Sequence, residues 1–107
     1  MSPTSYMPVM FEIRETDRFK TWLKNLKDRR AVIKIVARIR RIELGNLGDV
    51  KPVGENVSEM RIHYGPGYRI YFTRQGNRII ILLSAGTKKT QTQDIKAAMK
   101  MANEIKE

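Results

Sequence analysis

The chain has 107 residues, with 21 Lys and Arg against 11 Asp and Glu, a formal net charge of +10. This excess favours a polyanionic partner, nucleic acid before a membrane surface. The absence of cysteine excludes disulfides and thiolate chemistry, and with one histidine a zinc site would need carboxylates, so we expect no metal or cofactor. No run approaches the ~18 consecutive apolar residues of a membrane span, and no charged leader precedes an apolar signal core, so a soluble cytoplasmic protein is expected. The length fits one domain over residues 1–107.

The N-terminal part of the chain predicts a strand followed by two helices. Residues 1–7 indicate a flexible start, and residues 9–13 a short strand. Asp17 is the expected N-cap of the first helix and Asp28 that of the second, which ends where Gly45 can adopt a left-handed conformation. Apolar residues recur at helical spacing in both helices and are expected in the core, namely Phe19, Trp22, Leu23 and Leu26, then Val32, Ile35, Val36, Ile39 and Ile42.

Residues 59–72 predict a β-hairpin, with the sequence E-M-R-I-H-Y-G-P-G-Y-R-I-Y-F. Side chains alternate between the two faces of a strand, so the hairpin has an apolar row and a polar row. The apolar row is Met60, Ile62, Tyr64, Tyr68, Ile70 and Phe72. The polar row is Glu59, Arg61, His63, Arg69, Tyr71 and Thr73.

The turn of this hairpin decides which polar residues face each other. A three-residue loop at residues 65–67 would place His63 opposite Arg69 and Arg61 opposite Tyr71. A two-residue turn would slip the register by one residue and bury Arg69 and Tyr71 in the apolar row, which is costly without partners. We therefore expect the three-residue loop.

The remaining segments predict an α+β domain. Residues 46–56 are rich in glycine and indicate a loop or an edge strand, and residues 75–77 indicate a turn. The unbroken apolar run within residues 78–84 predicts a central strand covered on both faces. Thr90 and Gln93 fit a capping box before a terminal helix whose apolar stripe is Ile95, Ala98, Met99, Ala102 and Ile105. The expected order is β-α-α-β-β-β-α, an antiparallel sheet packed against two N-terminal helices and a C-terminal helix.

Basic residues are concentrated in residues 14–41, which hold 11 basic and 3 acidic side chains, so that 11 − 3 gives +8 of the total +10. Within this segment Lys34, Arg38 and Arg41 recur at helical spacing and are expected on the face away from the core. A solvated helix surface needs no such imbalance of sign, so we expect these three residues to bind RNA phosphates.

Four motifs, in this order, resemble the phage-derived addiction-module killer proteins of the RelE superfamily, near HigB. They are R-x-x-x-W-L-x-x-L-K-D at residues 18–28, G-N-x-G-D-x-K-P-V-G at 45–54, the hairpin at 59–72, and L-L-S-A-G-x-K-x-x-Q-x-x-D-I at 82–95. The resemblance implies a toxin of a type II toxin-antitoxin system that cuts mRNA on the translating ribosome without a metal. It also implies a cognate antitoxin, expected to be a HigA-like helix-turn-helix protein that carries the complex to operator DNA.

The resemblance assigns the main catalytic role to Arg69, which matches the arginine that RelE-type nucleases use against the scissile phosphate. The structural alternative for Arg69 is a cross-strand pair with Glu59 or another acid. Arg61 and Lys88 are expected as supporting cations, the latter in a loop before a helix N-terminus. His63 is the natural acid or base, because histidine exchanges protons near neutral pH. Tyr71, or Tyr68 in another register, is expected to stack on a base or donate a hydrogen bond. RelE has a tyrosine in its terminal helix region where this chain offers Gln91 or Asp94, and Gln91 is expected to contact RNA.

Two other functions share some of these features. ParE-type toxins of the same superfamily inhibit gyrase without cutting RNA, and fold alone does not distinguish them. A non-enzymatic nucleic-acid-binding module would account for the charge of +10 equally well. The retention of Arg61, His63, Arg69 and Lys88 favours the nuclease.

Overall fold

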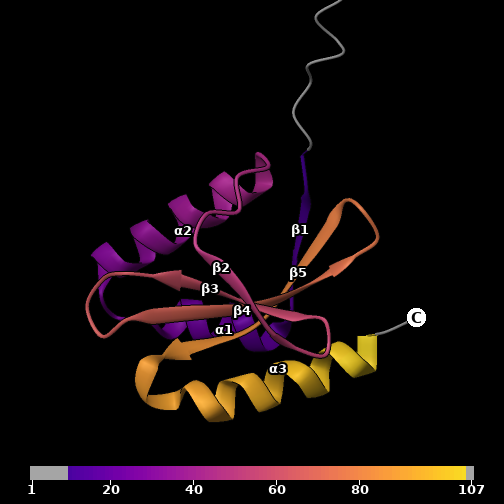
Figure 1. Cartoon of the computed structure of the whole chain (residues 1–107). Coiled ribbons are helices and arrows are strands. Elements are labelled where there is room, and N and C mark those ends of the chain that lie inside the picture. Colours follow the sequence, from indigo (N-terminus) through magenta and orange to yellow (C-terminus); the bar gives the residue numbers. More distant parts are fainter. Residues whose placement is uncertain (1–9, 106–107) are drawn as a thin grey trace, which may run out of the picture.

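The strands form one sheet with a helical layer on each face (Figure 1). The computed structural model describes residues 10–105, so the expected flexible start and the first residue of the expected N-terminal strand lie outside it. The elements are β1 (Glu12–Glu15), α1 (Asp17–Asn25), α2 (Arg29–Glu43), β2 (Val50–Gly54), β3 (Val57–Ile62), β4 (Tyr68–Gln75), β5 (Ile79–Thr87), a 3₁₀ turn η2 (Lys88–Thr90) and α3 (Gln91–Ile105). The predicted α+β class is confirmed, but the sheet has one strand more than the predicted order, because residues 46–56, expected as a loop or an edge strand, contain the edge strand β2.

The sheet has the strand order β1-β5-β4-β3-β2 and is mixed, which corrects the expectation of a purely antiparallel sheet. Neighbouring strands are antiparallel except β1, which runs parallel to β5. The parallel pair arises because α1 and α2 return the chain to the far edge of the sheet before β2 begins, so β1 and β5 are never joined by a short turn.

The apolar run of β5 is covered on both faces, as predicted. Ile80 and Leu82 pack with α1 and α2 in one core cluster, whereas Ile81 and Leu83 pack with α3 in a second. The strand order places β5 between β1 and β4, and Figure 1 shows α2 and α3 on opposite sides of the sheet. Phe19, Phe72 and Trp22 lie in or against the first cluster, as expected. Within residues 10–105 no helix combines the length and apolarity needed to cross a bilayer.

The helix ends agree with the prediction in part. Asp28 caps α2 by accepting from the N–H groups of Arg30 and Ala31, and Gly45 has a φ of 96°, both as predicted. The cap of α1 is Thr16 instead of Asp17, because the Thr16 hydroxyl accepts from Phe19 N–H while also donating to the carbonyl of Leu83. Asp17 occupies the first turn, where the helix dipole favours an acid.

Three further expectations about the helices need correction. Thr90 precedes α3, but its hydroxyl donates to the Asp94 carboxylate at 2.5 Å in place of the predicted box with Gln93. Val36 of the expected α2 stripe is half exposed, and Arg38 of the expected exposed face is buried. The α2 stripe is therefore rotated, with Arg38 turned toward the sheet.

The hairpin of β3 and β4 keeps the predicted faces but not the predicted register. Arg61 pairs with Arg69 and Glu59 with Tyr71, so each residue is shifted by two positions from the expectation. The connecting loop spans residues 63–67 in place of the expected 65–67, and within it Gly67 N–H donates to the carbonyl of Tyr64. A shift by two leaves each side chain on its face, since strand side chains alternate with period two.

Candidate active site and nucleic-acid interface

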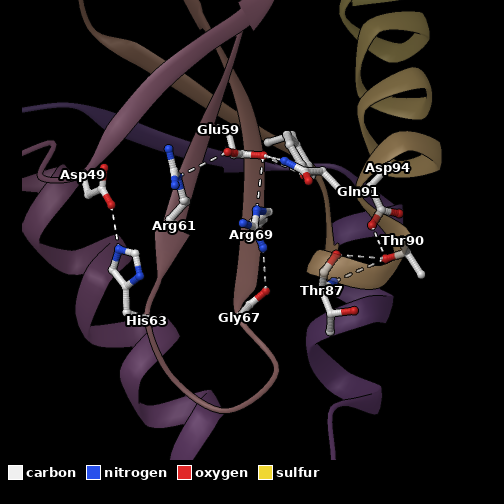
Figure 2. Close-up of polar contacts among 11 residues, drawn as sticks. Asp49, Glu59, Arg61, His63, Gly67, Arg69, Thr87, Thr90, Gln91 and Asp94 are labelled. Carbon is white, nitrogen blue, oxygen red and sulfur yellow. Dashed lines mark hydrogen bonds and ion pairs between the residues drawn. The ribbon is translucent and has the colours of Figure 1, made fainter.

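A buried carboxylate, Glu59, lies at the centre of the polar face of the hairpin. Its side chain is fully buried on β3. Glu59 Oε2 accepts a hydrogen bond from the Tyr71 hydroxyl of β4 at 3.0 Å and one from the Gln91 side-chain amide of α3 at 2.7 Å (Figure 2). Three elements thus meet at one carboxylate.

Two arginines share this carboxylate as their counter-ion. Arg61 Nε lies 3.5 Å from Glu59 Oε1, and Arg69 Nε lies 3.5 Å from Glu59 Oε2. The Arg61 side chain is 33% exposed and that of Arg69 is 12% exposed. Two cations facing one anion leave this cluster with one positive charge in excess, next to solvent.

The turn between β3 and β4 contacts Lys88, which follows β5, next to the arginine pair. The carbonyl of Gly67 accepts from Arg69 Nη1 at 3.2 Å and from the backbone N–H of Lys88 at 3.1 Å. Gly67 has a φ of 80°, a backbone conformation that favours glycine. The structure therefore places the backbone of Lys88 beside the turn that carries Arg61 and Arg69, so the three residues predicted as catalytic cations lie around one turn.

A groove between α2 and β3 adjoins Arg61 and has a volume of about 500 Å³. Its lining includes Lys34 and Arg41, both exposed, together with Asp49 and His63. His63 Nε2 lies 2.7 Å from Asp49 Oδ2, and this hydrogen bond is the main cause of the lowered pKa of Asp49. Figure 2 shows this pair on the Arg61 side of the cluster.

Arg38 corrects the expected set of three phosphate-binding residues on α2. Its guanidinium donates to the carbonyls of Leu47 at 3.0 Å, Asp49 at 3.1 Å and Arg61 at 3.4 Å. Burial, with a smaller effect of Arg41, lowers the pKa of Arg38. Arg38 thus holds the segment before β2 against β3 and has a structural role. Lys34 and Arg41, in contrast, are exposed at the surface.

The two tyrosines expected to contact RNA are buried, which corrects both assignments. Tyr71 has no exposed surface, and burial followed by the charge of Glu59 raises its pKa. Tyr68 is 5% exposed and packs edge-on against Trp22. Neither ring has a free face for a base. Tyr64 of the turn is half-buried, and Lys34, which lines the groove, lies over its ring with Nζ 5.3 Å from the centroid.

His63 and Gln91 also lie differently from the prediction. His63 lies in the turn and pairs with Asp49 instead of facing Arg69, because the register is shifted. The side-chain amide of Gln91 donates to Glu59, so Gln91 holds the buried carboxylate of the site in place. The role of Asp49 was missed, because the sequence gave no signal for it. The pair of Arg69 with Glu59, expected as the structural alternative for Arg69, is present in the structure.

Comparisons with known proteins agree with this fold. Residues 21–107 match the family described as phage-derived protein Gp49-like (DUF891). A protein of Haemophilus influenzae strain Rd, described as uncharacterized, is 46% identical over 94 residues, covering 88% of this chain and 95% of the relative. A free-state structure of a mutant of the E. coli toxin RelE has a TM-score of 0.64 at 14% identity, covering 86% of this chain and 97% of the other, so the fold is RelE-like. This chain belongs to the Gp49-like family of phage-derived proteins.

Proposed function

We propose that this protein is a toxin of a type II toxin-antitoxin system, of the HigB kind, that cuts mRNA on the translating ribosome. The observation that carries the proposal is the convergence of Arg61, Arg69 and Lys88 at the turn of one hairpin, beside a groove lined by Lys34 and Arg41. The RelE-like fold and the Gp49-like family support the same class of protein.

The proposed chemistry is attack of a ribose 2′-hydroxyl on the adjacent phosphate. The new bond joins the 2′-oxygen to phosphorus, the bond to the 5′-oxygen breaks, and the products are a 2′,3′-cyclic phosphate and a 5′-hydroxyl. The transition state gathers negative charge on the phosphate oxygens, so donors fixed in advance lower its free energy. Arg69 is the proposed main donor, with Arg61 and Lys88 on either side of the same phosphate.

His63 is the proposed proton carrier, and Asp49 the group that orients it. A carboxylate on one ring nitrogen fixes the tautomer of an imidazole and stabilises its protonated form. Asp49 lies 2.7 Å from His63 Nε2, which leaves the other nitrogen for the substrate. The side chain of His63 is 73% exposed, so an RNA strand following the groove can reach it.

Replacing Arg69 tests the proposal. Arg69→Lys retains a charge beside Glu59 but loses the fork of the guanidinium, and Arg69→Ala loses both. We expect cleavage of mRNA by programmed ribosomes to fall about 10²-fold in Arg69→Ala and by an intermediate factor in Arg69→Lys, with growth arrest relieved in parallel. Arg78→Ala, an exposed arginine in the turn before β5, is the matched control and should cut like the wild type.

Circular dichroism and thermal melting of each variant separate loss of chemistry from loss of fold. A folded Arg69→Lys or Arg69→Ala protein that cuts mRNA at the wild-type rate would refute the assigned site. Growth arrest by the wild-type protein with mRNA intact and gyrase inhibited would refute RNA cleavage as the function.

A further inference from the structure

Glu59 contacts the two arginines of the proposed site in the same way. Each arginine presents its Nε edge to the carboxylate, Arg61 to Oε1 and Arg69 to Oε2. A guanidinium has one N–H on Nε and four on its terminal nitrogens. The terminal N–H groups of both arginines therefore stay free of Glu59. One of them, on Arg69 Nη1, donates to the carbonyl of Gly67.

The carboxylate itself is held from two sides. Tyr71 and Gln91 both donate to Glu59 Oε2, one from β4 and the other from the first residue of α3. Glu59 Oε1 and Arg69 Nε are buried and have no hydrogen bond among the described residues, so the ion pairs are what offset the burial of these atoms. Both guanidiniums thus share one buried counter-ion, and Arg69 has the carbonyl of Gly67 as a second support.

We propose that Glu59 is a positioning residue for the RNA-cutting site, a role that rests on the function proposed above. It fixes the planes of Arg61 and Arg69 so that their terminal N–H groups point outward, toward where the phosphate binds. Glu59 does not touch RNA, because it has no exposed surface. Since catalysis depends on donors held in place before the reaction, a loose guanidinium slows the chemical step more than it weakens binding.

Glu59→Gln is the sharpest test, because it preserves the size of the side chain and an oxygen that can accept from Tyr71 and Gln91. We expect the single-turnover kcat for mRNA cleavage to fall about tenfold or more, with KM changed by less than about twofold. Glu104→Gln, an exposed acid on α3, makes the same change of charge and should leave both constants unchanged.

A second measurement works without catalysis. Nitrogen-15 NMR of the arginine Nε–H groups, with a short 2′-O-methyl RNA bound, should show two protected signals from Arg61 and Arg69 in the wild type. Both should be lost or averaged in Glu59→Gln, while the backbone amide spectrum stays that of a folded protein. Protected signals in a wild-type protein that fails to cut RNA would support positioning by Glu59 and refute the nuclease, so the two proposals fail separately.

Three results would overturn the proposal. Glu59→Gln could keep both its kcat and its protected arginine signals. It could lower KM at unchanged kcat, which would mean that Glu59 competes with phosphate for the arginines. If Glu59→Gln does not fold, Gln91→Ala removes one support of the carboxylate, and an unchanged kcat and arginine spectrum in that variant would refute positioning, whereas a lower kcat at constant KM would support it.

Discussion

Tyr71 shows how the neighbouring layer decides the role of a residue on a strand. Its hydroxyl lies on the polar face of the hairpin, but α3 covers that face at this point, so the ring is core and the hydroxyl binds Glu59. Arg69, two residues earlier on the same face, lies closer to the turn and keeps 12% of its side chain exposed. Two residues of strand separate a structural hydrogen bond from a solvent-facing cation.

The raised pKa of Tyr71 predicts a loss of stability in alkaline solution. The folded chain holds the phenolic proton more tightly than the unfolded chain, so this contribution is fully present below pH about 10 and is lost as the pH rises above it. Urea unfolding between pH 8 and 11 should show a steeper loss in the wild type than in Tyr71→Phe. At pH 8 the variant should be less stable by about 1–2 kcal/mol, because Glu59 loses a donor. Parallel pH profiles of the two proteins would contradict the assignment.

Gly86 on β5 should tolerate no side chain. A Cβ at this position would overlap the carboxylate of Asp94 and the hydroxyl of Thr90, which cross directly over the strand. Gly86→Ala should therefore lower the free energy of unfolding by about 1–3 kcal/mol, as measured by chemical denaturation. Gly76→Ala is the comparison, because Gly76 has a positive φ but nothing within 4 Å of its Cβ. A smaller loss in Gly86→Ala than in Gly76→Ala would mean that α3 moves away easily.

Among the elements, α2 combines a structural and a surface role on neighbouring turns. Arg38 turns inward to three carbonyls, while Lys34 and Arg41 reach the groove beside β3. Helical spacing placed all three on one face, but a long arginine can reach back to the sheet and satisfy carbonyls that would otherwise lack donors. One helix thus both closes the fold and lines the groove.

Replacing Lys34 and Arg41 together by Gln should weaken RNA binding without unfolding the protein. Each phosphate contact contributes roughly 0.7 to 0.9 to the slope of log K against log salt, so the slope should flatten by up to about 1.4 to 1.8. Fluorescence anisotropy with a labelled RNA at several salt concentrations measures it. Lys27, just before the α2 cap, and Arg30, in its first turn, are both exposed and give a control double variant with the same change of charge. Equal slopes in the two double variants would show that the groove has no special role.

Periodicity and caps predicted most elements, because each depends on a few neighbouring residues. The α2 cap at Asp28 and the two-sided cover of β5 were of this kind. The hairpin register depends on which residue closes a turn rich in glycine, and several closures leave the side-chain faces unchanged. The pairing of His63 with Asp49 joins residues 14 positions apart through that register, so local patterns could not reveal it. Burial of Tyr71 and Arg38 depended on where the helices cross the sheet, whereas burial of Tyr68 agrees with its place in the predicted apolar row.

On the scale of the whole molecule, the distribution of charge favours one surface that binds both RNA and an acidic inhibitor. Residues 14–41 hold most of the net charge, and the hairpin adds Arg61 and Arg69 at one end of the sheet. A surface that attracts phosphate attracts carboxylates for the same reason, so binding of the two becomes mutually exclusive.

We therefore predict that an acidic cognate antitoxin competes with RNA. Purified antitoxin should displace labelled RNA in proportion to its amount, and amide exchange in the complex should be slowed at residues 60–72. The competing arrangement places the antitoxin on α3, where residues 95–105 would be protected instead. Displacement with protection confined to the helices would contradict direct coverage of the hairpin.

The pairing of β1 with β5 also sets an order of events during synthesis. Glu12 pairs with Ile79 and Glu15 with Leu82, so the first strand finds its neighbour only after most of the chain has been made. Contacts so distant along the chain slow folding and leave apolar surface uncovered meanwhile. Gln91 follows later still and brings the last partner of Glu59. A chain that ends before α3 therefore lacks one support of Glu59, and the arginine cluster is complete only after the last helix has been made.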